Sequence, residues 1–288
     1  MNKKFFFSLV TLMLCVVCLW MVVSKGSIKI AEDEVPLANS AQQKSPDEAT
    51  DSLTDDDVVI EITVDDEKQD ANGRVICIDA GHQKKANMKK EPVGPGASKM
   101  KAKVDGGTVG TYTGLTEYQL NLDVALKLQT ELEKRGYTVI MVRTTNDVNI
   151  SNSERSEIAN AANADAFIRI HADGSDIASV NGASTLCQSA KNPYNGYLYE
   201  KSRKLADTVL EGVASSTGCK KRQVIESDSM TGINWSKVPT TIVEVGYLTN
   251  KAEEAKLGTA EYQQKIAEGI ADGIDSFFAE GENKESNE

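Results

Sequence analysis

Short apolar runs and longer amphipathic stretches alternate along residues 73–280. Five apolar runs of six or seven residues have the composition that favours β-strands. They are RVICID (74–79), YTVIMV (137–142), DAFIRIH (165–171), GASTLC (182–187) and TTIVEV (240–245). The first two runs are apolar on both faces, which is typical of strands that helices cover on both sides.

The stretches between these runs have the spacing of helices. Every fourth residue from Leu120 to Leu132 is apolar, which predicts a helix over residues 117–136 that Gly136 ends. We expect three further helices, from Ser153 to about Ala162, over about 197–216 and over about 262–278. Strands that alternate with helices predict an α/β fold, here a single domain with a mostly parallel twisted sheet flanked by helices.

The beginning of the chain has a third pattern, in which MNKK precedes 19 uncharged residues from Phe5 to Val23. As a helix these would span about 28 Å, close to the hydrocarbon thickness of a bilayer. We expect residues 1–26 to be an uncleaved membrane anchor, while SKG (24–26) leaves cleavage of a signal peptide open. The lysines before the apolar run favour export, which predicts an extracytoplasmic protein, anchored to the cell membrane or secreted to the cell wall.

Charge separates the next segment from the folded part. Residues 31–70 contain 14 acidic residues and two lysines, a charge of −12 in a chain whose net charge is −11. Because low hydrophobicity and charge repulsion prevent a packed core, we expect a disordered acidic linker over residues 27–72. The folded domain is expected over 73–280 and a polar tail over 281–288. No basic stripe with interleaved aromatic residues occurs, which argues against nucleic acid as a partner.

Residues 84–114 interrupt the alternation with seven lysines, two prolines and no clear element. A connection of this length in a compact domain is usually functional or mobile. Its lysines are equally consistent with binding an anionic polymer and with a solvated surface. A disulfide between Cys187 and Cys219 also stays open, because spacing alone cannot establish a pairing.

The motifs of several enzyme classes are missing from the sequence. It contains no Gly-x-Ser-x-Gly elbow, no Walker loop and no Gly-x-Gly-x-x-Gly that opens a helix. A cysteine protease that uses Cys187 stays formally open, although nothing marks that thiol as activated. The chain has only two histidines, His82 and His171, and both lie where a predicted strand ends.

Two glutamates occupy comparable positions: Glu117 opens the first predicted helix, and Glu244 closes the last apolar run. The carboxyl ends of parallel strands meet at one edge of a sheet, so we expect these side chains to converge with the histidines. Two imidazoles and a carboxylate that leave one coordination position open are typical of a hydrolytic zinc site.

Each of these residues also has a purely structural explanation. A histidine at a strand end often only hydrogen-bonds a turn, and Thr116 with Gln119 fits a capping box at the helix start. The acid at 244 is harder to explain in this way, because a buried carboxylate needs a partner. Asp79 and Asp173 fit ordinary turn residues better than groups that orient metal ligands.

Four longer blocks stand in order over residues 75–250: VICIDAGH, LTEYQLNLDVALKLQTELEKRGYTVIMVRTTND, ERSEIANAANADAFIRIHADGS and VPTTIVEVGYLTN. Together they resemble the zinc-dependent N-acetylmuramoyl-L-alanine amidases of bacterial cell-wall turnover, the amidase type 3 family. The resemblance implies a peptidoglycan hydrolase that cleaves the amide between the lactyl group of N-acetylmuramic acid and L-alanine. It also implies that His82, Glu117 and His171 bind Zn²⁺. The catalytic acid/base implied by the match is Glu244.

The sequence departs from the family at two places near these residues. It has Asp-Ala-Gly-His-Gln at 79–83 where Asp-Pro-Gly-His-Gly is common, and Arg169 where a serine is common. Neither change removes a ligand. Two other functions are kept beside the amidase, namely a catalytically silent peptidoglycan-binding or regulatory module of the same fold and another zinc hydrolase such as a sugar deacetylase. The sequence identifies no protein regulator.

Overall fold

A computed structural model describes residues 73–285 of the chain. The expected anchor (1–26), the expected acidic linker (27–72) and residues 286–288 lie outside the described residues. No helix within residues 73–285 is both long and apolar enough to cross a membrane.

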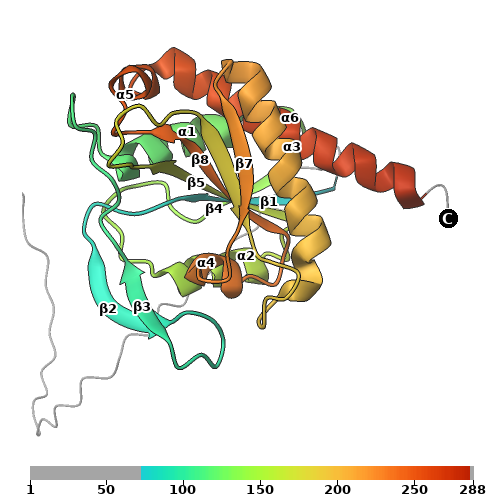
Figure 1. The fold of residues 1–288 in the computed structure, drawn as a ribbon. Helices are drawn as coiled ribbons and strands as arrows, with labels where there is room; N and C mark the ends of the chain where they lie inside the picture. The colour runs from blue at the N-terminus through green and yellow to red at the C-terminus, as the bar shows by residue number, and fades with distance from the viewer. Residues whose placement is uncertain (1–72, 286–288) are drawn as a thin grey trace, which may run out of the picture. The chain divides into compact units, whose positions relative to one another are not determined.

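The core of the described part is a six-stranded sheet with the strand order β4-β1-β5-β8-β6-β7 (Figure 1). Its strands are β1 (Val75–Ala80), β4 (Thr138–Met141), β5 (Ala166–Asp173), β6 (Ala183–Cys187), β7 (Lys221–Glu226) and β8 (Thr240–Tyr247). All neighbouring strands are parallel except β6 and β8, which run antiparallel. The predicted α/β fold with a mostly parallel sheet is therefore confirmed for these residues.

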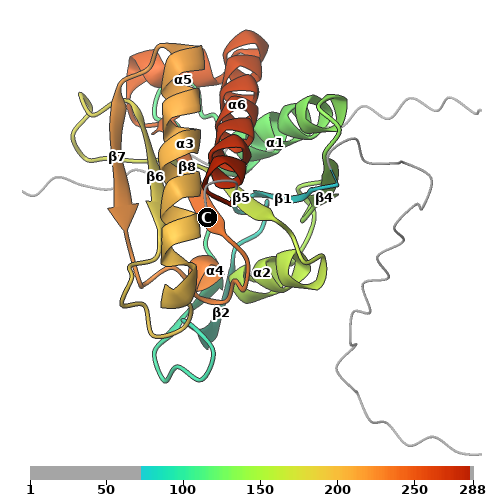
Figure 2. The same ribbon diagram turned by 90° about the vertical axis from the view of Figure 1, so that its right-hand side faces the viewer.

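Helices cover both faces of this sheet (Figures 1 and 2). One face carries α1 (Glu117–Lys134), α3 (Tyr199–Thr217) and α6 (Ala260–Glu285), and the other carries the short helices α2 (Asn152–Ala161) and α4 (Thr231–Asn234). A 3-10 turn, η1 (Gly196–Leu198), precedes α3, and α5 (Lys251–Leu257) follows β8.

The strands present opposite chemistry to the two helix layers because successive side chains alternate between faces. In β5, Ile168 and Ile170 join the main apolar core with α1, α3 and α6. The alternate residues Arg169 and His171 point to the opposite face, as Asp79 does in β1. Asp79, Arg169 and His171 therefore share the face that carries α2 and α4.

The ends of three helices differ in detail from the sequence prediction. Helix α2 begins at Asn152 rather than Ser153, because Ser151 and Glu154 form a reciprocal capping box around its first turn. At the start of α1, Thr116 makes no side-chain capping bond, so the capping box predicted there is wrong. Helix α6 continues to Glu285, and residues 281–285 are thus helical rather than a tail.

The lysine-rich segment contains a structural element that the sequence reading did not identify. It forms an antiparallel hairpin of β2 (Asn87–Pro92) and β3 (Met100–Val104). The hairpin is fastened to α4, since Asn234 Nδ2 donates to the Val93 carbonyl at 2.9 Å and Trp235 Nε1 donates to the Pro92 carbonyl at 3.0 Å. Cys187 and Cys219, whose pairing the sequence left open, are free thiols.

Candidate metal centre

The first histidine lies in the tight turn that leaves β1. His82 has a backbone φ of 60°, in the left-handed region that costs a non-glycine residue about 1–3 kcal/mol. The preceding Gly81 has no room for a side chain, because a Cβ there would lie 2.3 Å from the ring of His171. The turn is therefore shaped to bring the two histidine rings together.

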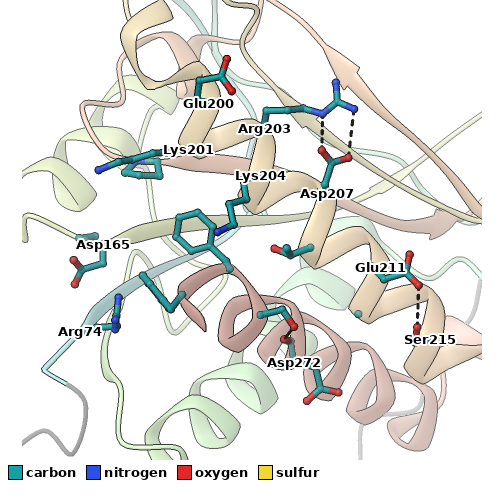
Figure 3. A pocket seen from close by; sticks show the side chains of 17 residues that line it. Arg74, Asp165, Glu200, Lys201, Arg203, Lys204, Asp207, Glu211, Ser215 and Asp272 are labelled. Atoms are coloured by element: carbon teal, nitrogen blue, oxygen red, sulfur yellow. Dashed lines mark hydrogen bonds and ion pairs between the residues drawn. The ribbon is translucent and has the colours of Figure 1, made fainter. Parts of the chain in front are cut away.

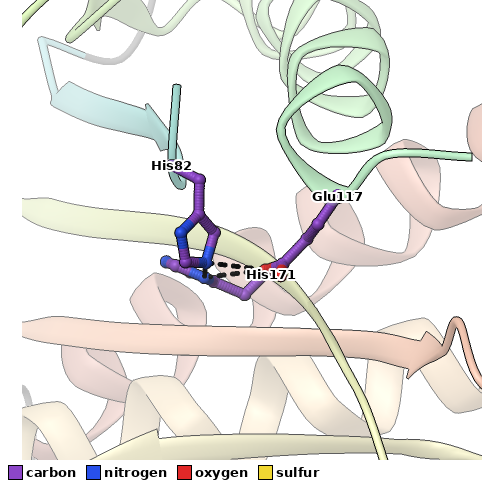
Figure 4. Close-up of side chains that lie close together, drawn as sticks. All are labelled: His82, Glu117 and His171. Atoms are coloured by element: carbon purple, nitrogen blue, oxygen red, sulfur yellow. Dashed lines mark hydrogen bonds and ion pairs between the residues drawn. The ribbon is translucent and has the colours of Figure 1, made fainter. Parts of the chain in front are cut away.

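His82, Glu117 and His171 converge as the sequence predicted (Figure 4). His82 Nε2 lies 3.0 Å from Glu117 Oε1, and His171 Nδ1 lies 3.1 Å from both of these atoms. Metal–ligand distances of about 2.0–2.1 Å in a tetrahedral site require donor atoms about 3.3 Å apart. The three donor atoms are thus spaced like three of the four corners of a tetrahedral site and could hold a metal ion.

The remaining polar atoms of the two rings agree with this arrangement. His82 Nδ1 lies 2.8 Å from Asp105 Oδ1, which leaves Nε2 facing the other donors. His171 Nε2 is buried and has no hydrogen-bond partner among the described residues, and its ring packs against Gly81. Asp105 was missed by sequence reasoning, because a lone acid after a lysine-rich stretch resembles any surface residue.

Glu117 is almost completely buried at the start of α1 and is held by backbone amides. Its Oε2 accepts a hydrogen bond from the Thr108 N–H at 2.7 Å, and its Oε1 accepts one from the Ala172 N–H at 3.1 Å. Burial by itself would raise the pKa of this carboxyl, but His171 and His82 outweigh it and hold the pKa well below the usual value. The side chain is therefore a carboxylate, as a metal ligand must be.

The two histidines differ in protonation in the metal-free protein. Burial alone would lower the pKa of His82, but its hydrogen bonds to Asp105 and Glu117 raise it to about 10. For His171, burial outweighs the attraction of Glu117 and lowers the pKa. The positive charge of protonated His82 thus lies between the carboxylates of Asp105 and Glu117.

Glu244 reaches the same place from the next strand. It stands opposite His171 in the register of β5 and β8, and both line a cavity of about 350 Å³ together with His82 and Glu117. Asp173, which the sequence suggested as a turn residue, lines this cavity as well. Burial, followed by the negative charges of Glu117 and Asp173, raises the pKa of Glu244 well above its usual value. The neutral, protonated form of this carboxyl is therefore favoured.

Asp79 is neither a turn residue nor a direct partner of a histidine, so both sequence interpretations are wrong. It is fully buried, with Oδ1 2.6 Å from Arg155 Nη1 and Oδ2 2.9 Å from Arg169 Nε. Burial would raise its pKa, but the charges of Arg155 and Arg169 hold the pKa well below the usual value. Arg155 was not identified from the sequence, and Arg169, a charge inside the apolar run FIRIH, was noted there only as a departure from the family.

A larger groove of about 1150 Å³ lies elsewhere, between α3, α6 and the amino ends of the strands (Figure 3). Both acidic and basic side chains line it, and none of its lining residues is a histidine or a cysteine. It shares no residue with the cavity of the metal centre. The cysteine-protease alternative also fails, because Cys187 is buried and burial raises its pKa to about 12.

Comparison with known proteins places the chain in a family. The family model described as N-acetylmuramoyl-L-alanine amidase matches residues 76–276. The uncharacterized protein YqiI of Bacillus subtilis is 34% identical over 206 residues, which cover 72% of this chain and 85% of that protein. The N-acetylmuramoyl-L-alanine amidase LytC of Bacillus subtilis is 33% identical over 174 residues, 60% of this chain but only 33% of LytC.

A solved structure gives the same result. The crystal structure of the N-acetylmuramyl-L-alanine amidase Ami1 from Mycobacterium smegmatis superposes with a TM-score of 0.66 at 25% identity, over 72% of this chain and 98% of that one. The matched region contains all four residues that converge at the cavity, and the resemblance noted in the sequence is confirmed. This chain therefore belongs to the N-acetylmuramoyl-L-alanine amidase family of peptidoglycan hydrolases.

Proposed function

We propose that this chain is a zinc-dependent amidase that hydrolyses the amide between the lactyl group of N-acetylmuramic acid and L-alanine of the stem peptide. The observation that carries the proposal is the meeting of three metal donors and Glu244 in one cavity, in a chain of the amidase family. A buried carboxyl without a ligand role, beside a set of three donors, is the combination that metal-assisted hydrolysis needs.

His82, Glu117 and His171 are the residues that hold Zn²⁺ in this proposal. When bound, zinc polarises the scissile carbonyl and lowers the pKa of water to about 7. Asp105 keeps the His82 ring oriented for binding through its contact with Nδ1. The donor set of two imidazoles and one carboxylate suits zinc better than calcium or magnesium, which prefer oxygen ligands alone.

Glu244 carries out the proton transfers. Its carboxylate takes a proton from the attacking water, and the resulting acid gives that proton to the leaving amine of L-alanine. Burial raises the pKa of Glu244, and the charge of a divalent cation held by the three donors would lower it. A pKa near the working pH suits a group that must accept and then donate. The products are a glycan strand without its peptide and a free stem peptide.

The place of action follows from the substrate. Peptidoglycan lies outside the cytoplasmic membrane, so we propose that the folded domain is exported. Residues 1–26 then serve as the membrane anchor and residues 27–72 as the linker that lets the domain reach the wall. Protease accessibility of the folded domain on intact cells tests this placement, and protection from added protease contradicts it.

The activity is tested with the full chain in mild detergent, zinc and a synthetic muramyl peptide. The expected product is the free stem peptide, identified by mass, and Glu244→Gln should lower kcat by about 100- to 10,000-fold. Glu261→Gln, an exposed carboxyl in the first turn of α6, is the matched control and should leave kcat unchanged.

The other outcomes of this experiment contradict the proposal. Release of acetate in place of peptide indicates a deacetylase. Binding of peptidoglycan without any turnover indicates a catalytically silent module. Full activity in Glu244→Gln removes the acid/base role from Glu244.

A further inference from the structure

The turn that carries His82 is held by hydrogen bonds from a fully buried arginine, Arg155. All five N–H groups of Arg155, which comes from α2, have acceptors in the described structure. These acceptors are Asp79 Oδ1 (2.6 Å), Gln83 Oε1 (3.0 Å) and the carbonyls of Ala80, His82 and Ile150 (each 3.1 Å). One guanidinium therefore binds the last residues of β1 and the backbone of the metal ligand itself.

A second buried arginine holds the same turn from the other side. Arg143, which follows β4, donates from Nε to the Ala80 carbonyl at 2.6 Å and from Nη2 to the Gly81 carbonyl at 3.1 Å. The same Nη2 donates to the Tyr118 carbonyl at 2.8 Å. Because Tyr118 follows Glu117 in α1, Arg143 joins the His82 turn to the start of the helix that supplies the second ligand.

The left-handed conformation of His82 explains why these hydrogen bonds to the turn are needed. A non-glycine residue leaves this conformation unless the surroundings hold it there. The carbonyls of residues 80, 81 and 82 all accept guanidinium N–H groups, and each of these bonds restrains the turn. We propose that Arg155 and Arg143 are positioning residues of the metal centre, which hold His82 Nε2 within reach of Glu117 and His171. This inference rests on the metal site of the proposed function.

The shape of the guanidinium matters as well as its charge. Arginine presents five donors in a rigid planar fork, whereas lysine offers three donors from one atom. A lysine at 155 keeps the positive charge beside Asp79 but cannot reach Asp79, Ala80 and His82 at the same time. Arg155→Lys therefore separates the positioning of the turn from the neutralisation of the buried carboxylate.

The chain offers a matched control in the same layer. Arg169 is also buried and also binds Asp79, with Nε 2.9 Å from Oδ2. Its other bond in this layer is to Asn152 Oδ1 at 2.8 Å, and it contacts no carbonyl of residues 80–82 in the described structure. Arg169→Lys thus perturbs the ion pair with Asp79 to a degree similar to Arg155→Lys, but it leaves the hydrogen bonds to the His82 turn intact.

The experiment measures metal binding in the full chain in mild detergent. Co²⁺ is titrated into the wild type, Arg155→Lys, Arg143→Lys and Arg169→Lys, and its absorption spectrum reports both the affinity and the coordination geometry. Zn²⁺ affinity follows from competition against Co²⁺, and thermal unfolding is recorded for each metal-free variant. We expect Arg155→Lys and Arg143→Lys to bind 10- to 100-fold more weakly, with a changed Co²⁺ spectrum. Arg169→Lys should stay within about threefold of the wild type and keep its spectrum, because it does not touch the turn.

Each outcome decides between the inferences. Absence of Co²⁺ binding in the wild type overturns the proposed metal site itself. Wild-type affinity and spectrum in Arg155→Lys and Arg143→Lys overturn the positioning role while leaving the metal site standing. An equal loss of Co²⁺ affinity in Arg169→Lys also overturns the positioning role, because any disturbance of the buried charges would then be enough to weaken metal binding. If Arg155→Lys does not fold, Arg143→Lys decides. If both are unfolded while Arg169→Lys is folded, the arginines act in folding and the inference falls.

Discussion

The face of the sheet that carries α1, α3 and α6 is held by one large apolar core, whereas the face that carries α2 and α4 combines two smaller apolar clusters with a layer of buried charge. On the first face, residues such as Ile168 and Leu128 are completely buried in one continuous core. On the second, Asp79 lies between two guanidinium groups in the layer beside the metal donors. Dispersion and burial tolerate small shifts of a side chain, but directional bonds fix its position. His171 and Glu244 therefore lie on the face with the directional contacts, and Glu117 joins them from the start of α1 at the edge of the sheet.

The largest expected effect is on the charged face. Asp79→Asn leaves Arg155 and Arg169 buried without their counter-charge, and breaking such a pair costs about 4 kcal/mol. We expect the free energy of unfolding, measured in urea, to fall by about that amount. A loss below about 1 kcal/mol would show that the charged layer contributes little to the fold and would remove the contrast between the faces.

A truncation on the apolar face should be costly in stability but harmless to the site. Leu128→Ala in α1 removes a fully buried side chain and should lower the free energy of unfolding by about 3 kcal/mol. Leu128 lies 11 residues after Glu117 in α1, about three helical turns away, so Co²⁺ affinity at 25 °C should stay within about threefold of the wild type. A large loss of affinity in this folded variant would mean that the two faces are not independent.

The raised pKa of His82 predicts a pH dependence of metal binding. In the metal-free protein this pKa is about 10, so a proton must leave His82 when a metal binds at neutral pH. Affinity should therefore rise about tenfold, or about 1.4 kcal/mol, per pH unit from about pH 7 until it levels off near pH 10. Asp105→Asn removes one cause of the raised pKa and should make the rise level off at lower pH. An affinity independent of pH between 7 and 9 contradicts this protonation state.

The same titration affects the stability of the metal-free protein. His82 has a higher pKa in the folded chain than in the unfolded one, so its contribution is complete below about pH 6.5 and is lost as the pH rises through about 10. Asp79 acts in the opposite direction. Its pKa is lowered by folding, so its contribution is present above about pH 4 and is lost as the pH falls further. Urea unfolding across pH should thus show declines at both ends, and Asp79→Asn should flatten the acid decline.

The smallest effect is expected at the cap of α2, the helix that supplies Arg155. Ser151→Ala removes the hydrogen bond that Ser151 Oγ accepts from the Glu154 N–H and should cost about 1 kcal/mol of unfolding free energy. We expect Co²⁺ affinity to stay within about threefold of the wild type, because the five hydrogen bonds of Arg155 remain. A larger loss would show that the start of α2 influences the metal site. Thr116→Ala should cost less, since Thr116 makes no capping bond.

Local pattern predicted the fold class, five of the six strands of the main sheet and the convergence of His82, Glu117, His171 and Glu244, whereas the roles expected for these four residues came from the family resemblance. Apolar runs predict buried strands because each residue there must be covered by neighbours, whatever they are. The strand-end positions of His82, His171 and Glu244 followed from the same runs, since parallel strands end at one edge. The edge strand β7, with its mostly exposed polar residues, lacks such a pattern and was missed.

Only the tertiary structure decided which polar residues serve the site. Asp105, Arg143 and Arg155 lie far from His82 in sequence, yet each contacts the ring of His82 or the turn that carries it. In sequence, such a residue resembles any charged surface residue, because periodicity records which face is buried but not which partner lies on it. The sequence by itself determined which residues could bind a metal. Long-range packing determined the left-handed turn and the buried charges that bring those residues together, because these bonds exist only once distant segments meet.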